Sequence, residues 1–368
     1  MATDLRLKAD LIDADLEKAE TLPARFYRDQ AYFEKAREDL FAKSWQFIGD
    51  ADQLTVPGQV IPVSLLPGYI DEPLIITRNL DDQLSCLSNV CTHRGNLLVE
   101  GACQSQNLRC RYHGRRFALD GKLISTPGFE NAKCFPTERD NLSSVPFGNW
   151  KNKFLFAAIN PAYTFEELIA PMRDRLSWLP LNQFIFDPSR SQDYIAKANW
   201  ALYCENYLEG FHIPFVHPAL ASAVDCKDYQ TETYRYSNLQ IGIALNPGEA
   251  FDLPKSSPDY GKKVAAYYYW LFPNMMFNFY PWGLSLNIVV PLAKDRTRIV
   301  YQTYIWDESK INIGAGANTD RTEREDENII EQVQKGVQSH FYDRGRYSPE
   351  WEAGPHHFHR LLTEFLSE

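Results

Sequence analysis

The chain has 368 residues, of which 44% are hydrophobic and 14% aromatic, and its formal net charge is −10. These values predict one or two packed domains, and the acidic balance argues against nucleic-acid binding, which requires clustered lysine and arginine. The chain has no apolar run of about 18 residues, so we expect no membrane span.

Residues 1–44 are expected to form an N-terminal helical segment that packs on a C-terminal domain. Within it, Gln30–Phe47 shows the helical spacing of Phe33, Leu40, Phe41 and Trp45. The first residues are polar and lack the apolar core of a secretory signal. The seven cysteines are odd in number and sparse, which favours a reducing, cytoplasmic location over a disulfide framework.

Residues 45–160 are expected to form an all-β domain. Short apolar runs at 60–63, 74–77 and 154–159 alternate here with glycine and proline turns, which is typical of short strands. Two Cys-His pairs lie inside this domain, Cys91 with His93 and Cys110 with His113. Thiolates and imidazoles on two loops are ligands for zinc or for an iron–sulfur cluster.

The single residue between Cys91 and His93 argues against zinc, whose modules usually separate the ligands of their first pair by two to four residues. A two-iron cluster fits better, with both thiolates on one iron and both imidazoles on the other. The remaining cysteines lack a ligand-spaced partner and are interpreted as ordinary thiols; they are Cys86, Cys103, Cys134, Cys204 and Cys226.

The C-terminal domain is expected over residues 161–368. A helix is predicted at 165–179 and a strand at 189–199, followed by strands at 239–245, 264–272, 284–291 and 298–305. Aromatic residues are concentrated between Tyr267 and Trp282. They are expected mainly to fill a curved sheet core. A pocket wall made of them would suit a planar ring or, through cation–π contacts, a quaternary ammonium group.

A second constellation runs from Asn199 to His217 and contains two histidines, His212 and His217. If the segment is helical, Glu205, Glu209 and His212 share one face, because residues three or four apart are neighbours. Pro214 is expected to bend the chain and to return the second imidazole toward the first. Two imidazoles and a carboxylate form the facial triad that holds non-haem Fe(II).

A late helix is predicted over residues 324–336. Ile329, Ile330, Val333 and Val337 form an apolar stripe, and Asp326 lies at its centre, whereas Glu325 points about 100° to one side. A buried carboxylate is costly unless it is paired or binds a metal. The alternative is a carboxylate that stabilises the helix N-terminus.

Cys91-Thr-His93-Arg-Gly and Cys110-Arg-Tyr-His113-Gly resemble the Rieske [2Fe–2S] motif. Together with the Asn199–His217 segment, they resemble the catalytic alpha subunit of Rieske non-haem iron oxygenases over residues from 21 to the C-terminus. The chain departs from the family at Arg111, Arg115 and Ala201, which concerns the surroundings of the cluster and the redox partner rather than ligation.

The resemblance implies an α+β fold, with an all-β Rieske domain and a catalytic domain of curved antiparallel sheet and helices. It implies a Rieske cluster, a mononuclear Fe(II) and O2 as co-substrate. It also implies a homotrimer and a ferredoxin or flavin reductase as electron donor. The chain has no Gly-x-Gly-x-x-Gly motif, so NAD(P)H would act only through that reductase.

The family context also supports Asp326 as the third ligand beside His212 and His217. By the same resemblance, Glu209 would link an iron-ligating histidine to His113 of a neighbouring subunit, and Asn206 would lie near the open iron position. The histidines at 340, 356, 357 and 359 are not expected to form a metal site, because no carboxylate constellation accompanies them.

We expect a terminal oxygenase that hydroxylates an aromatic small molecule. The alternative is a monooxygenase that hydroxylates or demethylates a quaternary amine of the choline, betaine or carnitine type. Two further hypotheses are a Rieske electron carrier without catalysis and a zinc-stabilised binding protein. The domain-sized segment beyond the cluster motif argues against the electron carrier.

Overall fold

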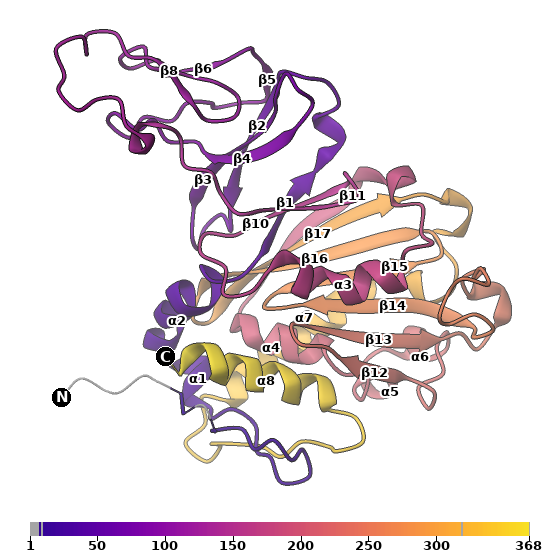
Figure 1. Ribbon diagram of the computed structural model, residues 1–368. Coiled ribbons are helices and arrows are strands. Elements are labelled where there is room, and N and C mark those ends of the chain that lie inside the picture. The colour runs from indigo at the N-terminus through magenta and orange to yellow at the C-terminus, as the bar shows by residue number, and fades with distance from the viewer. Residues whose placement is uncertain (1–6, 9, 318, 368) are drawn as a thin grey trace. The chain divides into compact units, whose positions relative to one another are not determined.

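The computed structural model describes residues 7–8, 10–317 and 319–367. The chain forms two compact units, residues 42–162 and residues 1–41 with 163–368 (Figure 1). The first is all-β and the second combines helices with one large antiparallel sheet, so the expected α+β fold class is confirmed. None of the helices in the described residues is long and apolar enough to cross a membrane.

The smaller unit contains ten strands in three sheets, ordered β1-β10-β9, β4-β3-β2-β5 and β6-β7-β8. Its strands are β1 Gln46–Asp50, β2 Gln59–Leu65, β3 Glu72–Arg78, β4 Leu84–Ser88, β5 Cys103–Gln104, β6 Leu108–Arg109, β7 Arg116–Phe117, β8 Leu123–Ser125, β9 Phe147–Trp150 and β10 Phe154–Ala157. Two short helical turns accompany them, η2 Ala51–Gln53 and η3 Glu138–Asp140.

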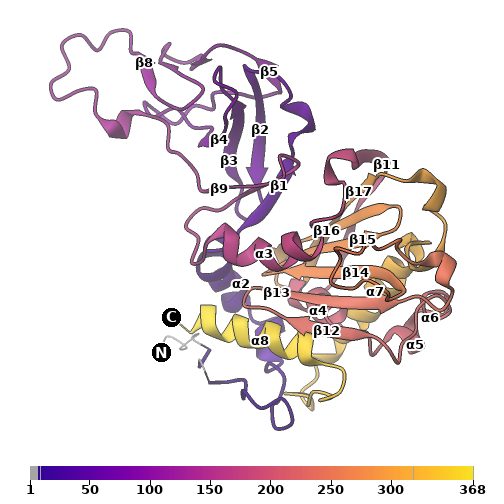
Figure 2. The ribbon, with the colours of Figure 1, turned by 45° about the vertical axis from the view of Figure 1, so that its right-hand side comes forward.

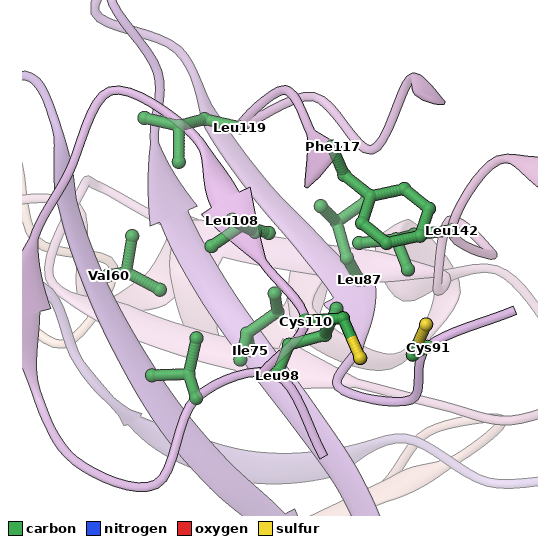
Figure 3. Close-up of a cluster of buried hydrophobic side chains, with 11 residues drawn as sticks. Val60, Ile75, Leu87, Cys91, Leu98, Leu108, Cys110, Phe117, Leu119 and Leu142 are labelled. Carbon is green, nitrogen blue, oxygen red and sulfur yellow. The ribbon is translucent and has the colours of Figure 1, made fainter. Parts of the chain in front are cut away.

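Strand pairing within the smaller unit buries one apolar cluster next to the cysteine loops. Val60 pairs with Thr77 across β2 and β3, and Ile75 pairs with Leu87 across β3 and β4. Cys91 and Cys110 form part of this cluster, and their sulfur atoms lie at its edge (Figure 3). The packed strands therefore hold both ligand loops from one side.

The larger unit is built on a seven-stranded antiparallel sheet in the order β11-β17-β16-β15-β14-β13-β12 (Figure 2). Its strands are β11 Ile185–Ala196, β12 Gln230–Thr233, β13 Ser237–Ile243, β14 Val264–Leu271, β15 Met275–Tyr280, β16 Gly283–Ala293 and β17 Arg296–Ile305. Its helices are α1 Arg25–Arg28, α2 Gln30–Ala36, α3 Phe165–Arg175, α4 Trp200–Tyr207, α5 Ile213–Val216, α6 Pro218–Ala221, α7 Thr319–Gly336 and α8 Ala353–Leu366. One π-helix, η1 Arg37–Phe41, continues α2, and the short 3-10 turns are η4 Leu181–Gln183, η5 Pro247–Glu249, η6 Glu308–Lys310 and η7 Gly314–Gly316.

Alternation along β14 separates the two faces of the sheet, because successive strand residues point to opposite sides. The Tyr269 hydroxyl donates to Pro171 O in α3, whereas the Trp270 ring packs edge-on against Phe358 in α8. Tyr268 lies on the same face as Trp270 and lines a cavity. Residues of the concentrated aromatic segment thus divide between sheet core and cavity wall.

Helix α4 is fixed at its start by Asn199, an N-cap residue whose side-chain oxygen accepts from Ala201 N. The Asn199 amide also donates to Lys294 O at 2.8 Å, and its backbone N–H donates to the Gln334 side chain at 2.7 Å. These bonds join α4 to the β16–β17 turn and to α7. The helix that precedes the histidines is therefore held by two other elements.

The N-terminal segment differs from the prediction at both ends. Residues 1–6 lie outside the described part, and residues 10–19 form bends and turns instead of a helix. Helical structure begins at Arg25 and ends at Phe41, so the predicted helix over Gln30–Phe47 is too long. Its last residues enter β1, where Phe47 pairs with Phe156, because strand pairing overrides the local helical spacing.

Candidate functional site

Three side chains of the larger unit converge on one point. His212 Nε2 lies 3.2 Å from His217 Nε2 and 3.5 Å from Asp326 Oδ1, and His217 Nε2 lies 2.9 Å from the same oxygen. In the part of the chain that the structure describes, this is the only group of three potential ligand atoms within 4.8 Å of one another. The side chain of His217 is buried, and those of His212 and Asp326 are largely so.

The far nitrogen of each imidazole faces a carboxylate. His212 Nδ1 lies 2.6 Å from Glu209 Oε1, and His217 Nδ1 lies 2.8 Å from Glu325 Oε2. These contacts place the imidazole proton on Nδ1, so both Nε2 atoms present lone pairs toward each other. Carboxylate–histidine pairs of this kind orient the ligands of metal ions.

A divalent cation fits this arrangement because it would resolve an unfavourable meeting of lone pairs. Two Nε2 acceptors and the Asp326 carboxylate face one another, and Asn206 Nδ2 donates to Asp326 Oδ1 at 2.6 Å. Burial would lower the pKa of His217, but Asp326 and Glu325 outweigh burial and raise this pKa. Surroundings that attract a proton also attract a cation, and two imidazoles with one carboxylate suit non-haem iron.

The chain between the two histidines folds differently from the predicted bent helix. Helix α4 ends at Tyr207, and His212 is the N-cap of the short α5, which has Pro214 in its first turn. Glu209 reaches His212 from the intervening turn, where its Oε2 also accepts from His212 N at 3.0 Å. Proline is tolerated in a first helical turn because its missing N–H would be unpaired there.

Glu205 does not share the face of Glu209 and His212, so that part of the prediction is wrong. Its Oε1 lies 3.0 Å from His359 Nε2 in α8, on the opposite side of α4 from the histidine pair. His356 contacts Asp13 O, and His359 contacts the Tyr347 hydroxyl through Nδ1. The C-terminal histidines therefore pack helix α8 and do not join the triad.

Helix α7 carries Asp326, but its buried face is rotated from the predicted stripe. Ile330 and Val337 are buried, whereas Val333 is 42% exposed. Gln334 is buried in its place because it accepts from Asn199 N. The rotation also brings Glu323 to the inside, and neither Glu323 nor Glu325 was predicted as a site residue. The separation of three residues between Glu323 and Asp326 was the available signal.

A cavity lies directly beside the triad and has walls of tyrosine. About 660 Å³ of space there is free of protein atoms, part of it open to solvent. Five tyrosines line it together with the triad, namely Tyr203, Tyr207, Tyr229, Tyr268 and Tyr280. The Tyr268 and Tyr280 rings meet edge to face with centroids 5.9 Å apart, and Tyr229 stacks beside Tyr268 at 6.4 Å. Three of the five come from segments outside the aromatic concentration seen in the sequence.

Glu323 is a second carboxylate on this wall. Its Oε2 accepts from the Tyr203 and Tyr301 hydroxyls at 2.6 and 2.7 Å, and its Oε1 accepts from Asn287 Nδ2 at 3.2 Å. Burial and the nearby Asp326 raise the pKa of Glu323 to about 7, although these three donors act in the opposite direction. Glu323 also borders a neighbouring cavity that contains Arg190.

The two ligand loops of the smaller unit share one backbone arrangement. Gly95 N donates to Cys91 O and Gly114 N donates to Cys110 O, and both glycines have positive φ, at +72° and +78°. Backbone N–H groups point at both sulfurs, from His93 toward Cys91 and from Tyr112 and His113 toward Cys110. Such donors stabilise sulfur ligands of a cluster.

The four side chains form two pairs. The His93 and His113 rings lie 4.6 Å apart, and Cys91 and Cys110 belong to the same buried cluster. No three of the four ligand atoms fall within 4.8 Å of one another, in contrast to the described His212–His217–Asp326 group. His93 Nδ1 is buried without a partner. A thiol pair and an imidazole pair suit a two-iron cluster better than one tetrahedral zinc ion.

Arg115 does not alter the surface of the cluster loops, because its side chain is buried. Its guanidinium lies over the Phe129 and Phe135 rings at 4.8 and 5.2 Å, and Nη1 lies 3.4 Å from Asp140 Oδ1. Arg111 and Tyr112, in contrast, are exposed. At position 115 the chain therefore differs from the family in the interior of the domain. At position 111 the side chain that differs faces solvent.

Two family models match the chain in the order of its two units. The Rieske [2Fe-2S] domain matches residues 44–136, and the ring hydroxylating alpha subunit (catalytic domain) matches residues 187–368. The chain is 28% identical to choline monooxygenase of Arabidopsis thaliana, over 95% of this chain and 84% of that protein. It is also 28% identical to the carnitine monooxygenase oxygenase subunit of Escherichia coli (strain K12), over 96% of both chains.

A solved quaternary ammonium Rieske monooxygenase has the same fold, with a TM-score of 0.78 and 24% identity, over 98% of this chain and 99% of that one. The family matches establish the cofactors as a Rieske [2Fe–2S] cluster and a mononuclear iron. They exclude the zinc-stabilised binding protein and the non-catalytic electron carrier. This chain is the alpha subunit of a Rieske-type non-haem iron oxygenase, an oxidoreductase that incorporates O2.

Proposed function

We propose that the protein is a monooxygenase of a quaternary ammonium compound. The observation that carries the proposal is the cavity of five tyrosines beside His212, His217 and Asp326. Aromatic faces attract quaternary ammonium groups, which cannot form hydrogen bonds. Relatives that match nearly the whole chain are named choline and carnitine monooxygenases, and this supports the same substrate class here.

Hydroxylation of an aromatic ring, the main expectation from the sequence, has less support. The cavity contains the carboxylates of Glu209, Glu323 and Asp326. A neutral ring gains nothing from these charges, whereas a cation does. We therefore rank oxidation of a quaternary amine above hydroxylation of an aromatic ring.

In this proposal His212, His217 and Asp326 hold the mononuclear iron, and Cys91, His93, Cys110 and His113 hold the cluster. When bound, the cluster supplies single electrons and the mononuclear iron supplies O2 activation. The net reaction consumes O2, two electrons and two protons. One C–H bond of the substrate becomes C–OH, and the second oxygen atom leaves as water.

The protein's own side chains orient these groups. Glu209 and Glu325 hold the two imidazoles by Nδ1, and Asn206 Nδ2 donates to Asp326 Oδ1 next to the cavity. Glu209 retains free lone pairs on both oxygens, so it can accept a further donor. We infer that this donor is His113 of a neighbouring subunit in a homotrimer. A solved relative is described with inter-subunit electron transfer, which supports this inference.

The electron donor is proposed to be a ferredoxin or a flavin reductase that uses NAD(P)H. Four exposed arginines lie on or beside the cluster loops, namely Arg94, Arg109, Arg111 and Arg116. They form a basic patch on an otherwise acidic protein, which suits an acidic donor protein. All seven cysteines are free thiols, and this agrees with a reducing compartment such as the cytoplasm.

A substrate panel tests the proposal. The iron-loaded protein with an NADH-dependent Rieske reductase is supplied with trimethylammonium compounds or with aromatic compounds such as naphthalene and benzoate. We expect substrate-dependent NADH oxidation and a hydroxylated or demethylated product only with the ammonium compounds. Formation of aromatic diols or phenols, without any product from the ammonium compounds, would instead support hydroxylation of an aromatic ring.

A further inference from the structure

The cavity beside the triad carries negative charge without a counter-charge from the protein. Glu209, Glu323 and Asp326 line it, and no lysine or arginine does so among the residues that the structure describes. A divalent ion held by His212, His217 and Asp326 would compensate Asp326 and the adjoining Glu209. Glu323 contacts neither imidazole, and a cationic ligand in the cavity would favour its ionised form, against the burial that raises its pKa to about 7.

On the basis of the proposed function, we infer that the substrate is a trimethylammonium cation without a carboxylate, and that Glu323 selects it. Choline-type cations belong to this class, whereas carnitine and glycine betaine are zwitterions. Glu323 is a specificity residue in this account, because it faces the substrate and does not touch the triad.

The partners of Glu323 leave its charge available to a ligand. Tyr203, Tyr301 and Asn287 donate to it, and all three are neutral. They fix the carboxylate in a buried position without cancelling its field. The charge of Glu323 also helps to raise the pKa values of Tyr207, Tyr268 and Tyr280, mainly raised by burial, so its field reaches the aromatic walls.

A ring wall and a carboxylate act together on a quaternary ammonium group. The methyl groups carry the positive charge and pack against tyrosine faces, and a carboxylate at longer range adds attraction without needing a hydrogen bond. The edge-to-face pair of Tyr268 and Tyr280 offers such a wall on the sheet side, and Glu323 lies on the α7 side. The cavity thus complements a cation from two sides.

A substrate carboxylate meets the opposite situation. It would share the cavity with the negative groups named above, and the described wall offers it no cationic side chain. Arg190 lies in the neighbouring cavity, beyond Glu323, and its Nε is 3.2 Å from Asp187 Oδ2. A zwitterion would have to place its carboxylate past Glu323 to reach this guanidinium.

Binding to the full-length, iron-loaded protein without O2, measured by calorimetry, tests the inference. The ligands are choline, its neutral isostere 3,3-dimethylbutan-1-ol, glycine betaine and carnitine. We expect choline to bind at least about tenfold more tightly than the other three. Glu323→Gln keeps the shape of the side chain and should weaken choline about tenfold, while the neutral isostere changes little.

Asp320→Asn is the matched control. It removes one negative charge from the same helix, one turn earlier, at a residue that borders only the neighbouring cavity. Choline affinity should stay within about twofold of the wild-type value. If Glu323→Gln fails to fold, the ratio of the wild-type affinities for choline and for its neutral isostere still tests whether the cavity selects a cation.

Equal affinity of the wild-type protein for choline and the neutral isostere would overturn the inference. So would tight binding of carnitine that Arg190→Gln alone abolishes. Either result would leave the proposed function intact, provided that some quaternary amine is oxidised with the reductase. Absence of any such oxidation would instead refute the proposed function itself.

Discussion

Glu323 and Asp326 lie one turn apart on α7 and border the same cavity, but their partners differ. Asp326 Oδ1 meets His217 Nε2 and Asn206 Nδ2, whereas Glu323 is held by two tyrosine hydroxyls and one amide. One helix therefore supplies one carboxylate suited to a metal ion and a second suited to a cationic ligand. Burial and the nearby Asp326 raise the pKa of Glu323 to about 7, so the two carboxyl groups need not both be ionised before a cation binds.

Asp326→Ala should remove the mononuclear iron and leave the two irons of the cluster. Asp326 supplies the only carboxylate in the converging group, and two imidazoles alone hold iron weakly. Iron and acid-labile sulfide per chain, with the visible spectrum of the cluster, give the measurement. Glu327→Gln on the same helix is the control and should keep all three irons. Full iron content in Asp326→Ala would remove Asp326 from the ligand set.

Glu325→Ala should weaken retention of the mononuclear iron about 10- to 100-fold, because His217 loses the partner of its Nδ1. Competition with a chelator, followed by iron analysis, measures the effect. Arg321→Ala removes the exposed ion-pair partner of Glu325 and should have little effect. Equal iron retention in both variants would show that Glu325 does not orient His217.

Glu209→Ala should leave the cluster spectrum unchanged and abolish coupled product formation. The variant removes the carboxylate that holds His212 by Nδ1 and by its backbone N–H. Product formed per NADH oxidised is the measurement. Glu205→Gln changes the carboxylate on the other side of α4 and should retain turnover. Normal turnover in Glu209→Ala would refute the proposed link to a neighbouring subunit.

Gly210→Ala should raise the KM for the ammonium substrate severalfold without changing iron content. A Cβ at Gly210 would lie 2.7 Å from Cε1 of Tyr229, so the ring must move within the cavity wall. Steady-state kinetics and iron analysis together measure this. Gly336→Ala has open space around its Cβ and is the control. An unchanged KM in Gly210→Ala would mean that Tyr229 does not contact the substrate.

The stability of the protein should fall in acid through Asp259. Burial alone would raise the pKa of this carboxyl, but hydrogen bonds from Arg175 and Lys262 outweigh burial and lower its pKa to about 2. The unfolded value is about 3.9, so the folded state binds this proton less well than the unfolded chain. The resulting stabilisation, about 2 kcal/mol, is present above about pH 4 and is lost as the pH falls toward about 2.

Urea unfolding of the wild type and of Asp259→Asn at several pH values measures this contribution. The wild type should lose more stability than the variant between about pH 4 and pH 2. Arg175→Met should cost about 3 kcal/mol at neutral pH, because it removes the guanidinium that pairs with both Asp259 and Glu232. Identical acid dependence in the wild type and Asp259→Asn would exclude this account.

The local parts of both metal sites could be predicted from the sequence. Cys91 and His93, like Cys110 and His113, lie within one turn of each other, so their spacing alone carries the ligand pattern. Asp326 followed from helix periodicity together with the family resemblance. The fold class followed from the strand and helix periodicities, which are local properties, together with the family resemblance.

Features set by tertiary contacts were not predictable. The buried face of α7 is rotated from the prediction because the Gln334 side chain accepts from the backbone N–H of Asn199. A search for apolar spacing does not find a polar residue at a buried position. The close approach of Gly210 to Tyr229 is likewise a contact between separate segments. The roles of Glu323 and Glu325 depend on which face of α7 is buried, and so they were missed.

The most direct test of the account is the stoichiometry of turnover under 18O2 with choline and a reductase. We predict equal amounts of NADH oxidised, O2 consumed and amine product formed, with one labelled oxygen transferred to the substrate before exchange with water. O2 consumption that yields only hydrogen peroxide with every trimethylammonium compound, while an aromatic substrate gains label, would contradict it.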